Sequence, residues 1–78
     1  MFVVAYFSYF SADLEQHIFK AESAYEAVVS LLSDVHKVED KDSLVKRYPT
    51  LESILSEYCP NTDCFISVTD VLNNETYN

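Results

Sequence analysis

The 78-residue chain has no glycine, no tryptophan and only two cysteines. Without glycine, the phosphate-binding loops that depend on it and the close backbone approach of an oxyanion site are disfavoured. Basic residues are also few, because five Lys and Arg stand against thirteen Asp and Glu, for a net charge of −8. This balance disfavours direct binding to nucleic acid or to an anionic membrane. From this balance we expect a partner that is basic, or a protein surface that tolerates an acidic face.

The length of the chain supports one small core. Hydrophobic residues make up 49% of the sequence and charged residues 23%, which is too apolar for a disordered chain. We expect one compact domain over residues 1–72, followed by a polar tail over residues 73–78.

The apolar start over residues 2–10 is too short to cross a bilayer and lacks the flanking signals of a secretory leader. We expect a cytoplasmic protein, in the host cytoplasm if the chain is viral. There Cys59 and Cys64 would stay reduced as small apolar fillers, and whether they ever pair is left open.

Three segments have the pattern of strands. Residues 2–10 are β-branched and aromatic on both alternating faces, which is typical of a central strand. Residues 14–20 alternate as a half-buried strand and form an antiparallel hairpin with the first. Residues 64–72 also alternate and predict the third strand.

Helices are predicted between the second and third strands. Ser23 and Glu26 fit a capping box in which the Ser23 hydroxyl and the Glu26 carboxylate each accept a backbone N–H. The following apolar stripe has helical spacing: Ala24, Ala27, Val28, Leu31, Leu32 and Val35. Asp42 or Ser43 is expected to cap a short helix.

Thr50 is expected to cap a further helix over residues 51–58, which Pro60 and Asn61 stop. The predicted fold is α+β: a three-stranded antiparallel sheet with two or three helices on one face, in the order β-β-α-(α)-α-β.

Little in the sequence indicates chemistry. The soft metal ligands are Cys59, Cys64, His17 and His36, and the two histidines lie far upstream of the cysteines without paired spacing. A cysteine nucleophile would need a positioned base and an oxyanion site. We therefore expect no enzyme activity, no catalytic residue, no metal and no cofactor.

Negative charge lies on both sides of a mixed segment over residues 37–47. In the folded chain it can form an acidic face whose carboxylates are spaced like the phosphates of DNA. Aromatic anchors would add affinity to the steering effect of charge. The predicted partner-binding residues are Glu15, Glu22, Glu26, Glu52, Glu57, Asp63, Tyr25 and Tyr58.

The segment Ile18-Phe-Lys-Ala-Glu-Ser-Ala-Tyr-Glu-Ala27 follows an N-terminal strand in a short acidic chain. In this it resembles the opening of small phage-encoded α+β proteins, among them anti-CRISPR and other host-takeover inhibitors. The resemblance covers roughly the first half of the chain, and its motif is largely a capped helix. It implies a viral accessory protein that binds and blocks a host protein, and it carries over no functional residue.

Two functions follow from these patterns. The first is a non-enzymatic acidic protein that inhibits a host nucleic-acid-handling protein by occupying its basic site as a DNA or RNA mimic. The alternative is a structural or regulatory interaction module, acidic only for solubility. Because the helices suffice to cover one face of the sheet, the other face would be exposed or buried against a partner, including a second copy in a homodimer.

Overall fold

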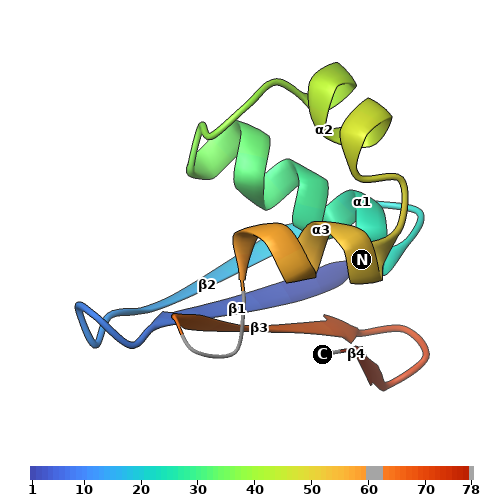
Figure 1. Ribbon diagram of the computed structural model, residues 1–78. Coiled ribbons are helices and arrows are strands. Elements are labelled where there is room, and N and C mark those ends of the chain that lie inside the picture. Colours follow the sequence, from blue (N-terminus) through green and yellow to red (C-terminus); the bar gives the residue numbers. More distant parts are fainter. Residues whose placement is uncertain (60–62, 78) are drawn as a thin grey trace.

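The computed structural model describes residues 1–59 and 63–77 as a sheet with all its helices on one face (Figure 1). The sheet is antiparallel throughout, with strand order β2-β1-β3-β4. Its strands are β1 (Phe2–Ser8), β2 (Leu14–Phe19), β3 (Cys64–Asp70) and β4 (Glu75–Tyr77). The helices are α1 (Ala24–Ser30), its π-helical continuation η1 (Leu31–Val35), α2 (Lys41–Arg47) and α3 (Leu51–Tyr58). The α+β class and the central place of β1 are confirmed.

The predicted strand count is wrong, because the sheet has four strands in place of three. The additional strand, β4, lies in the segment expected as a polar tail and pairs with the end of β3. Asp70 closes the connecting turn, since its Oδ1 accepts the backbone N–H of Leu72 at 3.1 Å and its Oδ2 accepts Nδ2 of Asn73 at 2.8 Å. Asn74 takes a left-handed conformation at φ 57°, which asparagine tolerates better than most residues. The hydrogen bonds of the Asp70 side chain thus stabilise a β3–β4 turn that contains no glycine.

Polar side chains cap all three α-helices. Ser23 Oγ accepts the backbone N–H of Glu26, but the Glu26 carboxylate accepts the N–H of Glu22 and not that of Ser23, so only half of the expected capping box forms. The cap of α2 is Asp40, not Asp42 or Ser43.

Thr50 caps α3 as predicted, in a capping box completed by Ser53. The predicted stop of this helix at Pro60 and Asn61 lies outside the described residues.

The first helical segment ends with η1 at Val35, and Lys37, two residues later, is left-handed at φ 55°. The next residue, Val38, donates its backbone N–H to the carbonyl of Leu32 at 3.0 Å, so the chain folds back onto the last turn of η1. Glycine is the usual residue at this left-handed position. In a chain without glycine, lysine occupies it at a conformational cost of about 1 kcal/mol.

The core lies between the sheet and the helices. Val4 and Val68 lie opposite each other on β1 and β3, fully buried. Leu31, Leu44 and Ile54 belong to the same core cluster from the helix layer and are also fully buried. Among the described residues, no helix is long and apolar enough to span a membrane.

Cys59 and Cys64 form a disulfide with their Cα atoms 5.3 Å apart, a separation that suits such a bond. Both residues are buried, as fillers at a helix end and a strand start would be. The pair differs from the expected reduced thiols, and it ties the end of α3 to the start of β3.

Candidate functional site

Three of the predicted acidic residues lie at helix starts. Glu22 and Glu26 stand at the beginning of α1, and Glu52 stands in the first turn of α3; all three are exposed. The two helices contact each other and begin at the same end of the molecule, on the right of Figure 1. No ion pair involves these three carboxylates in the described part of the chain.

The remaining acidic residues of the predicted face lie elsewhere. Glu57 is exposed near the end of α3, and Asp63 is exposed just before β3, where its carbonyl accepts the backbone N–H of Tyr9 at 3.0 Å. Near α2, basic partners are present, since Arg47 pairs with Glu39 at 2.6 Å and Lys41 with an aspartate of η1 at 3.3 Å. The carboxylates of the predicted face are therefore divided between the helix layer and the sheet, with a small concentration at the starts of α1 and α3.

Tyr25 and Tyr58, predicted as partner anchors, are half-buried and hold the helices together. Tyr25 donates its hydroxyl to the carbonyl of Tyr48 at 2.6 Å, and burial raises its pKa. Tyr58 donates to Oε2 of Glu39 at 2.8 Å. Burial and then this bond to a carboxylate raise the pKa of Tyr58 to about 12. Both hydroxyls are thus occupied within the chain.

Glu15 lies between the two histidines of the protein. His17 Nε2 donates to Glu15 Oε1 at 3.0 Å, and His36 Nε2 donates to the same oxygen at 3.1 Å. The bond from His17, followed by that from His36, lowers the pKa of Glu15. The ring of His36 also stands edge-on to Tyr6, with ring centroids 4.7 Å apart. This cluster fixes β2 to the end of η1.

The cluster is not an open metal site. The Nε2 atoms of His17 and His36 are both taken up by hydrogen bonds to one oxygen of Glu15. In the described ranges, no group of three or more His, Cys, Asp and Glu side chains is arranged to hold a metal ion.

The face of the sheet turned away from the helices carries no charged side chain at the positions of its four strands; we call it the free face. Along each strand, every second side chain points to this face, and the buried Val4 and Val68 point to the other. The register of the four strands then defines its members: Val3, Ala5, Phe7, Leu14, Gln16, Ile18, Phe65, Ser67, Thr69 and Thr76.

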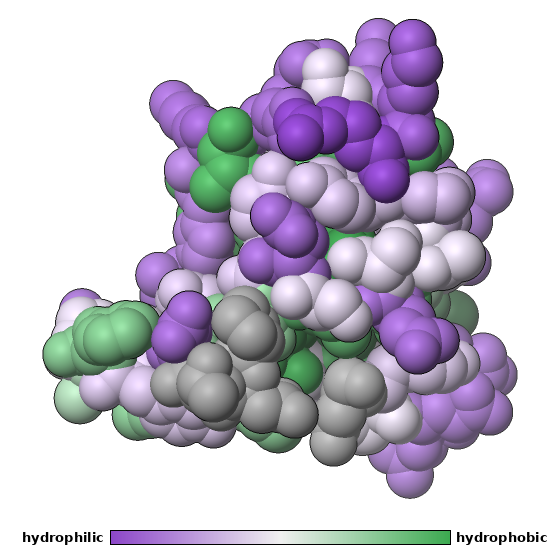
Figure 2. Space-filling view, in the orientation of Figure 1, coloured by the Kyte–Doolittle hydropathy of each residue, from purple (hydrophilic) through white to green (hydrophobic). Residues whose placement is uncertain are grey.

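Large apolar side chains of the free face are open to solvent. Leu14 is 64% exposed, Ile18 67% and Phe65 40%. The apolar surface continues onto the β1–β2 hairpin turn, where Phe10 is 84% exposed. Figure 2 shows this hairpin end as a hydrophobic area at the lower left, against a largely hydrophilic helix layer. Exposed apolar patches are a common feature of protein interaction sites, so the free face is the candidate site.

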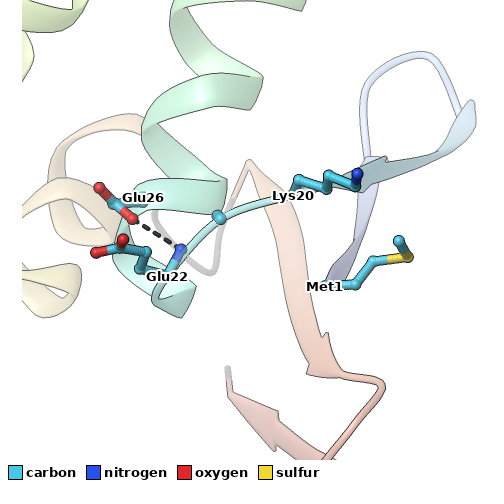
Figure 3. A pocket seen from close by; sticks show the side chains of 5 residues that line it. Met1, Lys20, Glu22 and Glu26 are labelled. Carbon is cyan, nitrogen blue, oxygen red and sulfur yellow. Dashed lines mark hydrogen bonds between the residues drawn. The ribbon is translucent and has the colours of Figure 1, made fainter.

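An open depression of about 520 Å³ lies between the N-terminus, the end of β2 and the start of α1 (Figure 3). It is lined by Met1, Lys20, Ala21, Glu22 and Glu26. Its one basic and two acidic side chains are all exposed. Binding pockets are enclosed and mainly apolar, and this depression is neither.

The free face follows from the alternation in strands 2–8 and 14–19, but the convergence of the histidines does not. His17 and His36 lie in different elements, and only the packing of η1 over the sheet brings them to one carboxylate. No signal in the local sequence indicates that contact.

Comparisons of the chain with family models, curated proteins and solved structures gave no match.

Proposed function

We propose that this chain is a protein-binding module without chemistry of its own, and that it binds an apolar surface of its partner through the free face. The observation that carries the proposal is the exposure of Leu14, Ile18 and Phe65 on a face free of charge. The chain carries thirteen carboxylates, yet none occupies a free-face position of the four strands. A partner surface of the same apolar character fits it, because burying charge without a counter-charge is costly.

The test is a capture experiment with matched variants. Tagged wild type, Phe65→Ser and Glu52→Lys are each exposed to lysate of the source cell at low and moderate salt. Phe65 lies on the central free face, and Glu52 lies on the helix layer. We expect a partner retained by wild type and Glu52→Lys at both salt concentrations and lost with Phe65→Ser. Equal retention by Phe65→Ser, with its thermal unfolding showing that it folds, contradicts the proposal.

A second candidate function is the acidic inhibitor that occupies a basic nucleic-acid site. The observation that favours it is the group of Glu22, Glu26 and Glu52 at the adjoining starts of α1 and α3. Electrostatic binding of this kind weakens as salt rises. In the same capture experiment it predicts the reverse pattern: a partner displaced by salt or by added DNA, lost with Glu52→Lys and kept with Phe65→Ser.

A further inference from the structure

The outer edge of β2 is an open strand edge. β2 is the first strand in the sheet order, so only one of its sides pairs with another strand. Natural sheets block such edges with proline, lysine or a bulge. β2 has none of these within Leu14–Phe19, and its one charged residue, Glu15, is held by the two histidines. The opposite edge, β4, has only three residues.

The backbone groups on this open edge can be identified. The N–H of Ser8 donates to the carbonyl of Asp13 at 3.2 Å, so these two form a hydrogen-bonded pair. Hydrogen-bonded and non-hydrogen-bonded pairs alternate along an antiparallel ladder. The N–H and C=O groups of Glu15 and His17 therefore bond to β1. Those of Leu14, Gln16 and Ile18 point away from the sheet.

We propose that the β2 edge pairs with the β2 edge of a second copy of this chain, antiparallel, around a two-fold axis at Gln16. Gln16 then lies opposite Gln16 of the second copy, and Leu14 lies opposite Ile18 of the second copy. Each of these pairs exchanges two backbone hydrogen bonds, because their N–H and C=O groups are the outward ones. This inference stands on the sheet edge and does not depend on what binds the free face.

The side chains select this register over its neighbours. Around Gln16, the apolar Leu14 meets Ile18 of the second copy on the free face, and Glu15 meets His17 of the second copy on the helix side. An axis at Glu15 would set two carboxylates against each other, which is destabilising. An axis at His17 would set Leu14 against Lys20 of the second copy. The Gln16 register alone matches apolar with apolar and carboxylate with imidazole.

The helix layer leaves room for a neighbouring strand. α1 packs on β1 and β3, and the helix-side residues of β2 remain partly open, with Glu15 38% and His17 30% exposed. Two-fold pairing makes one continuous sheet with both helix layers on the same side. The two free faces then join into a single apolar surface of twice the area.

Sedimentation equilibrium on purified chain tests the pairing. Wild type is expected to reach twice its mass of 9.0 kDa. The double variant Leu14→Lys, Ile18→Lys opposes like charges across the axis and is expected to associate at least about tenfold more weakly. Leu14→Glu, Ile18→Lys removes the same apolar groups but opposes unlike charges, and is expected to keep the dimer. A monomeric wild type, or equal behaviour of the two double variants, overturns the proposal.

A cross-linking experiment reports the register directly. The Cα atoms of a hydrogen-bonded antiparallel pair lie about 5.5 Å apart, which a disulfide spans. Under oxidised glutathione, Gln16→Cys is expected to form a covalent dimer. Thr76→Cys, on the opposite edge strand, is the control and is expected to stay monomeric. Equal cross-linking of the two variants contradicts the axis at Gln16.

Failure of this inference can be told apart from failure of the proposed function. If wild type is monomeric and the partner is lost with Phe65→Ser, the β2 pairing is wrong and binding through the free face still stands. If Gln16→Cys forms the cross-linked dimer and Phe65→Ser still captures the partner, the proposed function is wrong and the β2 pairing still stands.

Discussion

Glu15 and His36, separated by 21 positions, are joined by a 3.1 Å hydrogen bond between Oε1 of the carboxylate and Nε2 of the ring. His17 donates to the same oxygen at 3.0 Å. The carboxylate therefore connects an edge strand of the sheet to the end of the first helical segment. We expect it to make the stability of the fold depend on pH.

Glu15→Gln is expected to reduce the loss of stability in acid. The pKa of Glu15 is lowered below its ordinary value of 4.5 by the bonds from His17 and then His36. A lowered folded-state pKa gives stability that is present above about pH 4.5 and lost as pH falls through the folded-state pKa. Urea unfolding of wild type from neutral to acidic pH should show this loss, and that of Glu15→Gln should show less.

The control for this experiment is Glu52→Gln, an exposed residue outside the cluster. It should keep the acid dependence of wild type. If Glu15→Gln also keeps it in full, the histidine bonds do not stabilise the fold.

Tyr58→Phe is expected to remove a late step from the alkaline titration. The pKa of Tyr58 is raised to about 12 by burial and by its bond to Glu39. A raised folded-state pKa gives stability that is fully present below about pH 10 and lost as pH rises to about 12. Phenolate absorbance as a function of pH measures the step.

The variant should also unfold about 1 kcal/mol more easily at neutral pH, because the hydrogen bond to Glu39 is lost. Tyr9→Phe, at a half-exposed ring of the hairpin turn, is the control and should leave the late step in place. If the late titration step remains in Tyr58→Phe, that step belongs to another tyrosine.

Two lysine-to-glycine changes should have opposite effects. Lys37 is left-handed at the end of the first helical segment, and Lys37→Gly is expected to raise the free energy of unfolding by about 1 kcal/mol. Lys46 is inside α2, and Lys46→Gly is expected to lower it by about the same amount. Chemical denaturation compares the two, and a change of the same sign in both would contradict the left-handed assignment.

Asp70→Ala is expected to free β4 from the sheet. The Asp70 carboxylate accepts the backbone N–H of Leu72 and the side-chain amide of Asn73, and these bonds hold the turn that returns the chain to β3. Amide hydrogen exchange at Glu75 and Tyr77, whose backbone N–H groups face β3, should become several-fold faster, while exchange along β1 stays slow. Unchanged exchange at Tyr77 would show that the strand pairing holds without the turn.

Local signals predicted the parts of the fold that local chemistry determines. The caps Ser23 and Thr50 are predictable because a capping hydroxyl accepts a backbone N–H of the first helical turn, only three residues away in the sequence. The predicted cap of α2 is wrong because Asp40, Asp42 and Ser43 are all suitable capping residues, and the sequence alone does not distinguish among them.

The features that were missed depend on contacts between distant residues. β4 is too short and polar to show a strand pattern, and it forms because Asp70 holds its turn. Glu15, expected on the acidic face, is bound by His17 and His36 through tertiary packing. Tyrosine is a residue type that often anchors interfaces, but the hydroxyls of Tyr25 and Tyr58 form hydrogen bonds within the chain.

Covalent footprinting of the chain, alone and bound to the partner that it retains, tests binding through the free face most directly. A photoactivated carbene labels side chains according to their exposure, and Phe65 and Glu52 report the free face and the helix layer. We expect labelling of Phe65 to fall several-fold on binding while labelling of Glu52 stays constant. Unchanged labelling at Phe65 with protection at Glu52 would contradict this account and place the partner on the acidic helix layer.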